Sequence, residues 1–276
     1  MTNTVLVTGT SSGIGLATAV AAARAGWRVV ATMRDTSRSG ALVEAAKAAG
    51  VADLIDVRAL DVTDAAATCV DDVVAEYGRL DAVINNAGAG HVGTLEQESI
   101  DDIRGVFEVN FFGVLNVTKA ALPHLRAAQG RLITITSVGG VVGQPFNEAY
   151  CGAKFAVEGF MESLSPLAAA HGVRVTVVEP GAVASEFVAN VGFDPAQLEA
   201  AGPYAPQLRS YLERTRNAFD GAQTSEDAAA SIVDVLTAEK PAFRVQTSDA
   251  ARTFSGTKLS DLDGSVVQSL TAGWVS

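Results

Sequence analysis

Cysteine and histidine are both scarce in this chain of 276 residues. Cys69 and Cys151 are too few for a disulfide framework, and such usage is typical of a reducing compartment in which both stay thiols. His91, His124 and His171 are scattered, and the absence of a His-Glu-x-x-His motif disfavours a metal-dependent hydrolase. We therefore predict a cytoplasmic protein without a metal site.

Long apolar runs and an excess of positive charge are also missing. Charged residues interrupt every apolar stretch well before the roughly 18 residues of a membrane-spanning helix, and no signal-peptide pattern opens the chain. The formal net charge is −11, so a nucleic acid or an anionic membrane would be bound against the overall field. We predict a soluble protein with a small-molecule partner, no nucleic-acid partner and no membrane insertion.

Apolar residues make up 48% of the chain, which is ample for a buried core. Short β-branched runs alternate with alanine-rich helical stretches, a pattern that predicts βαβ units. We predict an α/β fold in a single domain: a Rossmann-type doubly wound parallel sheet with helices on both faces. The expected strands are residues 5–7, 28–33, 54–60, 82–84, 132–136, 173–178 and 243–246, and the expected helices are residues 14–25, 42–49, 65–77, 100–128, 149–170, 207–218 and 225–236.

The regular alternation of strands and helices does not extend along the whole chain. Beyond Pro180 the regularity breaks, and we predict a substrate-binding insert at about residues 185–222. The tail at about residues 250–276 is compatible with capping a pocket, joining a partner or fraying. Earlier in the chain, glycines at the ends of predicted helices are expected C-caps, namely Gly26, Gly50, Gly78, Gly130 and Gly172.

A glycine-rich segment, residues 8–15, follows the first predicted strand and opens the first predicted helix. N–H groups at a helix N-terminus attract a pyrophosphate, and glycine lets the backbone approach it closely. The spacing is Gly-x-x-x-Gly-x-Gly, and a tight βα turn without a ligand is the alternative. The predicted cofactor contacts are Gly9, Ser11, Ser12, Gly13, Ile14 and Gly15.

The tip of the second predicted strand bears on the choice of cofactor. In dinucleotide folds an acidic residue there binds the ribose 2′-hydroxyl, whereas a basic residue accommodates a 2′-phosphate. Met33 stands at the acid's position and Arg34 follows, so Arg34 with the loop serines favours NADP(H) over NAD(H). In the alternative, Arg34 is a solvated surface residue and Asp35 is the ribose acid.

Tyr150 and Lys154 have the i,i+4 spacing that places them on one face of a predicted helix, with Asn147 as its expected N-cap. A cation about 5 Å from the phenol, at an effective dielectric constant of about 20, stabilises the phenolate by about 3 kcal/mol. We therefore expect a lowered tyrosine pKa, and Tyr150 would deprotonate an alcohol or protonate an alkoxide.

Two polar segments end neighbouring predicted strands, at the sheet edge where ligands bind in open α/β folds. Ser137 follows residues 132–136, and its hydroxyl is placed to stabilise charge that develops on a substrate oxygen. The segment of residues 85–88 suits contact with a ribose or adenine, and we predict cofactor contacts from Asn86, Ala87 and Gly88.

Over about residues 4–185 the chain closely resembles the short-chain dehydrogenase/reductase family. The matching residues are Thr8, Gly9, Gly13, Ile14, Gly15, Asn85, Asn86, Ala87, Gly88, Asn110, Ser137, Tyr150, Lys154, Pro180 and Gly181. The resemblance implies that Asn110 holds a proton-relay water and that Ser137 orients the substrate. It implies that Tyr150 is the acid/base and that Lys154 binds the nicotinamide ribose. It further implies nicotinamide contacts from Pro180, Gly181 and Val183, and adenine contacts from Asp61 and Val62.

Residues 31–35 and 137–151 resemble the hydroxysteroid and retinol dehydrogenase branch of this family, which implies NADP(H) and a hydrophobic alcohol or carbonyl substrate. Helix pairing in the family implies a homodimer or homotetramer, although Pro166 removes a hydrogen bond from the helix concerned. A nucleotide-sugar epimerase is disfavoured by the roughly 90 residues after Gly181, too few for its sugar domain. A non-catalytic NADP(H) sensor on the same fold is the alternative function.

Overall fold

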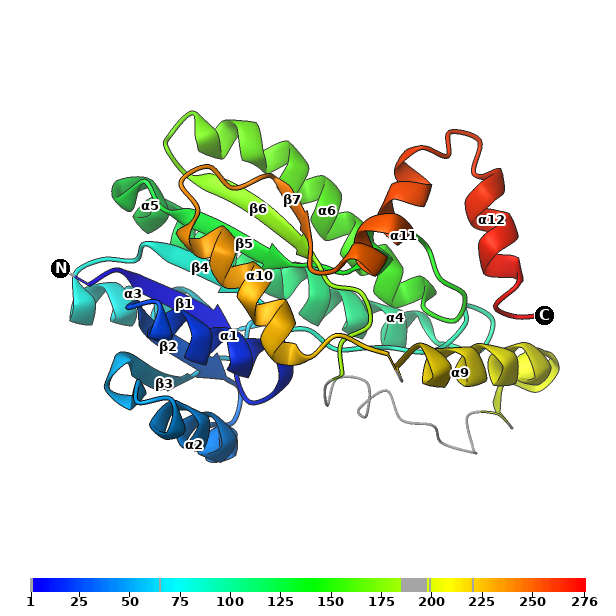
Figure 1. Cartoon of the computed structure of the whole chain (residues 1–276), viewed down its shortest axis with the longest axis horizontal. Coiled ribbons are helices and arrows are strands. Elements are labelled where there is room, and N and C mark those ends of the chain that lie inside the picture. The colour runs from blue at the N-terminus through cyan, green and yellow to red at the C-terminus, as the bar shows by residue number, and fades with distance from the viewer. Residues whose placement is uncertain (1, 65, 185–197, 199, 220) are drawn as a thin grey trace.

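The computed structural model (Figure 1) describes residues 2–64, 66–184, 198, 200–219 and 221–276. All seven strands run parallel in one sheet of order β3-β2-β1-β4-β5-β6-β7. Strands β2 and β3 are added on one side of β1, and strands β4 to β7 are added on the other side. The strand order therefore reverses between β1 and β4, which is the point where open α/β sheets bind ligands. The predicted doubly wound fold is confirmed. The strands are β1 (Thr4–Thr8), β2 (Arg28–Met33), β3 (Ile55–Ala59), β4 (Ala82–Asn85), β5 (Arg131–Ile135), β6 (Arg174–Glu179) and β7 (Arg244–Gln246).

Helices cover both faces of the sheet, so its strands alternate between two apolar cores. On β1, Leu6 packs into one core with α3, α5 and α6, whereas Val5 and Val7 pack into the other with α1, α2 and α10. In Figure 1, α1 and α10 lie side by side in front of the sheet. The helices are α1 (Gly13–Arg24), α2 (Gly40–Ala48), α3 (Ala66–Tyr77), α4 (Ile100–Phe107), α5 (Gly113–Ala128), α6 (Glu148–Ala169), α9 (Ala205–Phe219), α10 (Ser225–Thr237), α11 (Asp249–Leu259) and α12 (Ser265–Ala272).

The helix predicted over residues 100–128 is not one α-helix. It is interrupted by a π-turn at Glu108–Phe112, between α4 and α5. A π-turn widens the backbone by one residue and re-aims the side chains around it, and such turns are frequent at functional sites. Asn110 lies within this turn.

Four of the five predicted glycine stops have positive φ, and Gly130 is the exception. Gln129 takes the left-handed conformation there, with φ 51° and ψ 44°. Glycine is still required at the next position, because a Cβ on Gly130 would strike the carbonyl oxygen of Asp81. Gly130 was predicted as a C-cap stop. In the structure, glycine is needed at this position because of the close approach of Asp81, and not because of its φ angle.

Helix α6 runs through Pro166 and ends at Ala169, so the proline lies in its last turn and the helix keeps nearly the predicted length. The predicted insert lies partly outside the described residues. Its described part contains α9, which packs with the tail through a small apolar cluster. Figure 1 shows α9, α11 and α12 at the end of the molecule toward which the strands point. The members of the cluster are Phe146, Ala201, Leu208, Tyr211 and Trp274.

Candidate functional site

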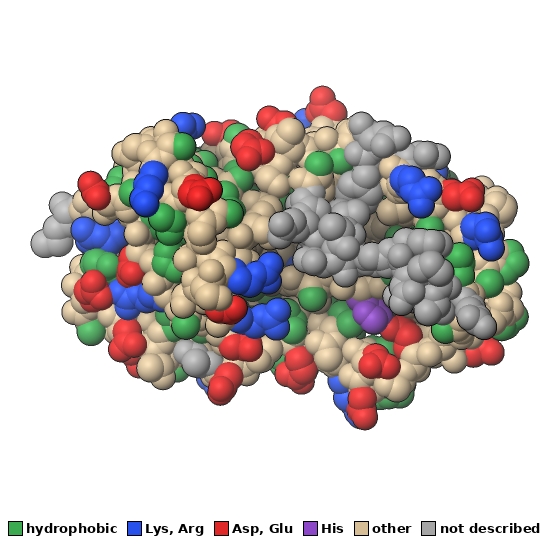
Figure 2. All heavy atoms as spheres, turned by 90° about the horizontal axis from the view of Figure 1, so that it is seen from below, with side chains coloured by type: hydrophobic (Ala, Val, Ile, Leu, Met, Phe, Trp, Pro, Cys, Tyr) green, Lys and Arg blue, Asp and Glu red, His purple; other side chains and the backbone are tan. Residues whose placement is uncertain are grey.

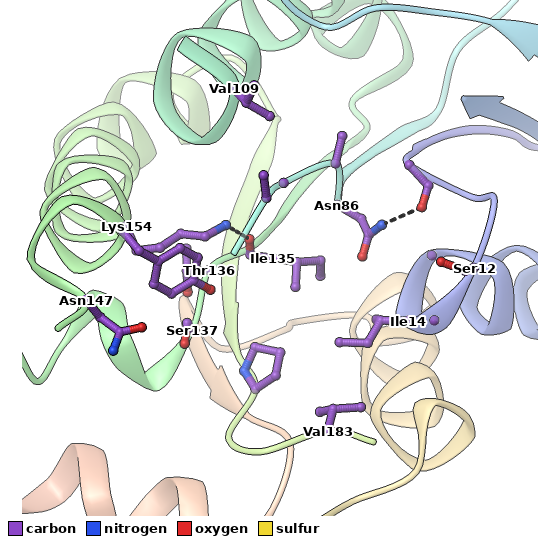
Figure 3. A pocket seen from close by; sticks show the side chains of 18 of the residues that line it. Ser12, Ile14, Asn86, Val109, Ile135, Thr136, Ser137, Asn147, Lys154 and Val183 are labelled. Carbon is purple, nitrogen blue, oxygen red and sulfur yellow. Dashed lines mark hydrogen bonds between the residues drawn. The ribbon is translucent and has the colours of Figure 1, made fainter. Parts of the chain in front are cut away.

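A cavity of about 1190 Å³ opens at the carboxyl ends of β1, β4 and β5. Ligand pockets usually measure about 300–1,000 Å³, so this cavity has room for more than one small molecule. The structure brings to its wall every predicted site residue except Asn110. In Figure 3, Ser137, Asn147 and Lys154 lie on one side of the cavity, and Ser12, Ile14 and Asn86 lie on the other.

The glycine-rich segment forms a cradle at the N-terminus of α1. Gly9 and Gly13 have φ of 70° and 58°, which side-chain-bearing residues rarely adopt. A Cβ on Gly15 would strike the carbonyl oxygen of Gly9 and the side-chain amide of Asn86. The first turn of α1 holds no acidic residue, and the Ser12 hydroxyl does not cap it. The helix N-terminus is therefore not neutralised by its own side chains and is suited to a phosphate.

The residues after β4 fix the cradle in place. Asn86 Nδ2 donates to the carbonyl oxygens of Thr8 and Gly9, at 2.9 and 3.0 Å. The Thr8 hydroxyl accepts from the backbone N–H groups of Asn86 and Ala87, at 3.0 and 2.9 Å. Asn86 was predicted as a direct cofactor contact. It lines the cavity, and its amide nitrogen holds the loop that forms the cradle.

The far end of the cavity, at the tip of β2, carries charges of both signs. Arg34 and Arg38 line it together with Asp35 and Asp61, and Arg38 was not predicted from the sequence. Met33 is 3% exposed, whereas Asp35, the alternative ribose acid, is exposed beside Arg34. The Asp35 carboxylate accepts from Ser37 N–H at 3.0 Å, and hydrogen bonds from Ser37 lower the pKa of Asp35. Hydrogen bonds from Thr63, and more weakly the Arg34 charge, lower the pKa of Asp61.

Tyr150 and Lys154, both on α6, meet Ser137 at the end of β5. Ser137 Oγ accepts from Gly139 N–H at 2.9 Å and shares a hydrogen bond with the Tyr150 phenol. Lys154 Nζ donates to the Ile135 carbonyl at 3.1 Å, drawn as a dashed line in Figure 3, and lies 5.8 Å from the centroid of the Tyr150 ring. An ammonium has three donors, so two remain for the cavity.

The pKa values of this group are set mainly by burial. Burial raises the pKa of Tyr150, and the hydrogen bond from Ser137 opposes the rise. Burial lowers the pKa of Lys154 to about 8, against the charge of Glu158. The lowered tyrosine pKa expected from the sequence is therefore not found in this structure. The physical reason is that both groups are desolvated and that the lysine points to a backbone carbonyl.

Asn110 lies behind the cavity wall rather than on it. Asn110 is fully buried, and its Nδ2 donates to the carbonyls of Ala89 and Val106, at 3.0 and 3.1 Å. Its Oδ1 accepts from Ala89 N–H at 3.2 Å. The side chain therefore anchors the loop after β4 to the π-turn, and a role for Asn110 in proton relay stays a prediction.

Late segments of the chain form the remaining wall of the cavity. Tyr211 on α9 and Trp274 in the tail line it, and Asn147 donates to the Tyr211 hydroxyl at 2.6 Å. Asn147 was the expected N-cap of α6, but its side chain makes no capping hydrogen bond. The sequence carries no motif for these wall residues. The position of Trp274 agrees with capping of the pocket by the tail, which was one of the three options left open.

The cavity is chemically suited to a dinucleotide. A Cβ on Gly9 would lie 2.8 Å from the Ala87 Cα, so the phosphate cradle exists only with glycine there. The cradle, the charged end at the tip of β2 and the pair of Tyr150 and Lys154 lie along one continuous space. Among the described residues, no group of three metal-ligating side chains is present, and no described helix is long and apolar enough to cross a membrane.

Known proteins share this sequence pattern. A family profile described as short chain dehydrogenase matches residues 3–195. Retinol dehydrogenase 8 of Bos taurus is 37% identical over 278 residues, covering 95% of this chain and 87% of that protein. The 17-beta-hydroxysteroid dehydrogenase type 1 of Mus musculus is 35% identical over 268 residues, covering 95% of this chain and 78% of that protein.

Solved structures share the architecture. A short-chain dehydrogenase from Streptomyces avermitilis has a TM-score of 0.78 and 32% identity, covering 99% of this chain and 97% of that chain. An alcohol dehydrogenase from Thermococcus sibiricus complexed with 5-hydroxy-NADP has a TM-score of 0.73 and 24% identity, covering 89% and 96%. A short chain dehydrogenase/reductase from Burkholderia phymatum in complex with NAD has a TM-score of 0.79 and 22% identity, covering 95% and 94%. The last two structures, at 24% and 22% identity, show only that their fold is shared with this chain.

Proposed function

Because this chain belongs to the short-chain dehydrogenase/reductase family and is therefore an oxidoreductase acting on CH–OH groups, we propose that it uses NADP(H) to interconvert an alcohol and a carbonyl on a hydrophobic substrate. A nicotinamide dinucleotide as cofactor agrees with the NADP and NAD complexes of the structural neighbours. The observation that carries the proposal is the meeting of Tyr150, Ser137 and Lys154 at one end of a cavity whose other end is a phosphate cradle.

The chemistry divides between the cofactor and the protein. The bound nicotinamide supplies or accepts the hydride. Tyr150 transfers the proton at the substrate oxygen, giving it during reduction and taking it during oxidation. In this structure Ser137 is hydrogen-bonded to the Tyr150 phenol, and its O–H would turn to the substrate oxygen when a substrate binds; Gly139 N–H occupies only an acceptor position on the hydroxyl and does not prevent this. Lys154 holds a positive charge beside the phenol and keeps donors for the nicotinamide ribose.

Part of the cavity wall supports a hydrophobic substrate. Val92, Val109, Leu212 and Trp274 line it beside polar residues such as Gln144 and Asn147, and apolar and aromatic surface favours a hydrophobic substrate. Retinol and 17-beta-hydroxysteroid dehydrogenases are among the relatives by name, which supports a bulky apolar alcohol or ketone. The described part of the proposed insert contributes Leu212 on α9 to this wall.

The test is NADPH consumption, and NADP⁺ reduction in reverse, over steroid, retinoid, quinone and aliphatic carbonyls and alcohols. We expect turnover with a bulky apolar member and little with short polar ones. Tight NADPH binding with silence across the panel would instead support the alternative, a non-catalytic sensor. The two buried cysteines are free thiols, which agrees with the proposed cytoplasmic location.

The preference for NADP(H) is tested at Arg34, which is exposed and lines the end of the cavity at the tip of β2. A charge-assisted hydrogen bond contributes about 1.5–3 kcal/mol, so Arg34→Ala should weaken NADPH binding by about tenfold or more and leave NADH binding within about twofold. Fluorescence titration with both cofactors measures this. Arg24→Ala removes an exposed arginine from the last turn of α1, outside the cavity, and serves as the control. Equal weakening of both cofactors would reject a 2′-phosphate contact.

We also propose a homo-oligomer, formed through the exposed aromatic residues around the π-turn and α6. Phe112, Phe155 and Phe160 are 45%, 39% and 42% exposed. Phe111 packs edge-to-face on Phe112 and Phe160, with centroids 5.1 and 6.2 Å apart, so these rings form one surface. Analytical ultracentrifugation should show a dimer or tetramer that Phe160→Asp dissociates. A monomer at micromolar concentration would contradict the proposal.

A further inference from the structure

A second buried charged residue lies one helical turn beyond Lys154. Glu158 is 5% exposed and is carried by the same helix, α6. We propose that Glu158 is a positioning residue for Lys154: its buried negative charge, one turn away on the same helix, keeps the lysine ammonium protonated. The inference rests on the proposed role of Lys154 and adds the group that maintains it.

Neighbouring strands hold the Glu158 carboxylate rigidly. Thr136 Oγ1, directly after β5, donates to Oε1 at 2.5 Å. Arg244 on β7 donates to Oε2 from Nη2 and Nε, at 3.3 and 3.4 Å. Thr136 directly precedes Ser137 in the chain. The residue that binds the Glu158 carboxylate is therefore the neighbour of the proposed substrate-orienting serine. These contacts from two strands fix the orientation of the carboxylate.

Arg244 is itself fixed by a second buried acid. Its Nε lies 2.7 Å from Glu179 Oε1, and Glu179 is fully buried at the end of β6. Glu179 Oε2 accepts from Gln246 Nε2 and Ser255 Oγ, at 3.0 and 2.9 Å. The cluster therefore spans β5, β6, β7, α6 and α11. It ties the tail to the helix that carries Lys154.

Two acidic residues, Glu158 and Glu179, lie in this region with two basic residues, Lys154 and Arg244. Glu162, one turn further along α6, also contacts Arg244 at 3.3 Å but is 65% exposed. Tyr150 is the titratable group on the other side of the lysine. The Glu158 carboxylate bonds Thr136 and Arg244 rather than Lys154, so it acts on the ammonium through its negative charge at a separation of one helical turn.

The directions of the pKa shifts agree with this arrangement. Burial lowers the pKa of Lys154 to about 8, and the charge of Glu158 acts against that fall. Burial raises the pKa of Glu158 to about 7, opposed by Thr136 and Arg244. A neutral residue at position 158 removes the opposing charge, so the lysine pKa must fall further. The lysine would then lose its proton at a lower pH.

The direct test is a titration of the lysines by NMR in protein labelled with ¹³C-lysine, without substrate or cofactor. In Glu158→Gln we expect the Lys154 signal to titrate about one pH unit lower than in the wild type. Glu162→Gln, which loses a contact to the same arginine at the surface, should leave it unchanged. Signals are assigned by Lys154→Arg. An unshifted Lys154 in folded Glu158→Gln overturns the proposal. The other lysines serve as internal references, namely Lys47, Lys119, Lys240 and Lys258.

Activity provides the second measurement. The alkaline limb of the kcat profile for carbonyl reduction should move to lower pH in Glu158→Gln and stay in place in Glu162→Gln. If Glu158→Gln does not fold, Thr136→Val removes the hydroxyl donor and should shift the lysine titration in the same direction, whereas Thr136→Ser should not. No difference between these two variants would also overturn the proposal. A shifted titration in a protein without turnover on any substrate would contradict the proposed function and leave the coupling intact.

Discussion

Replacing Tyr150 with phenylalanine is expected to lower turnover by about 100- to 10,000-fold, the contribution of a well-placed proton donor. The ring keeps its place on α6, so the cavity keeps its shape, and NADPH binding should stay within a few-fold. Burial raises the pKa of the phenol, which favours the protonated form at neutral pH and suits the donor role in carbonyl reduction. Steady-state kinetics and fluorescence titration of the cofactor measure the two quantities.

The matched control for this variant is Tyr77→Phe. Tyr77 lies at the end of α3, away from the cavity, and its hydroxyl donates to Asp56 at 3.0 Å. Its replacement removes a phenol hydroxyl without changing the site. We expect unchanged turnover in Tyr77→Phe. Normal turnover in Tyr150→Phe would mean that another group transfers the proton.

The second large effect is expected at Gly15. A methyl group there would strike the Gly9 carbonyl and the Asn86 amide, and Asn86 bonds the carbonyls of the cradle. We expect Gly15→Ala to open the phosphate loop and to cost about 1–3 kcal/mol of stability from overpacking. If two phosphate hydrogen bonds are lost, NADPH binding falls by at least about 100-fold. Urea unfolding and cofactor titration measure these changes.

Gly40→Ala is the control for this substitution. Gly40 is also near the start of a helix, has φ −51°, and meets nothing within 4 Å of an added Cβ. It should keep both the stability and the affinity of the wild type, or gain slightly in stability. Unchanged NADPH affinity in Gly15→Ala would show that the cradle does not contact the phosphates.

The sheet could be predicted from the sequence because a parallel strand buried on both faces leaves a continuous apolar run. The cofactor half of the site was equally accessible, since glycines at β1, Arg34 at β2 and the polar ends of β4 and β5 all lie at one edge by topology. The interruption at Glu108–Phe112 was not predicted, because a π-turn keeps helical composition and changes only the hydrogen-bond register.

The substrate wall and the charged cluster behind Lys154 were not predicted for a different reason. Their members come from elements far apart in sequence: Glu158 from α6, Arg244 from β7 and Trp274 from the tail. Each residue alone has no periodicity or motif, and only the packing of late segments against early ones brings them together. The prediction of a lowered Tyr150 pKa considered only the attraction between the phenolate and the Lys154 ammonium. The structure does not bear it out, because burial removes water from both side chains.

The apolar cluster formed by Phe146, Ala201, Leu208, Tyr211 and Trp274 has a consequence for how such a protein can diversify. It is separate from the two cores that hold the sheet together. The cofactor cradle is complete by Val183, whereas Tyr211, Leu212 and Trp274 of the proposed substrate wall come from later residues. Substitutions confined to α9 and the end of the tail are therefore expected to change the substrate range while the sheet, the phosphate loop and the proton donor are inherited intact. Helix α10 and strand β7, which lie between these two segments, complete the core and the sheet and are not part of this replaceable region.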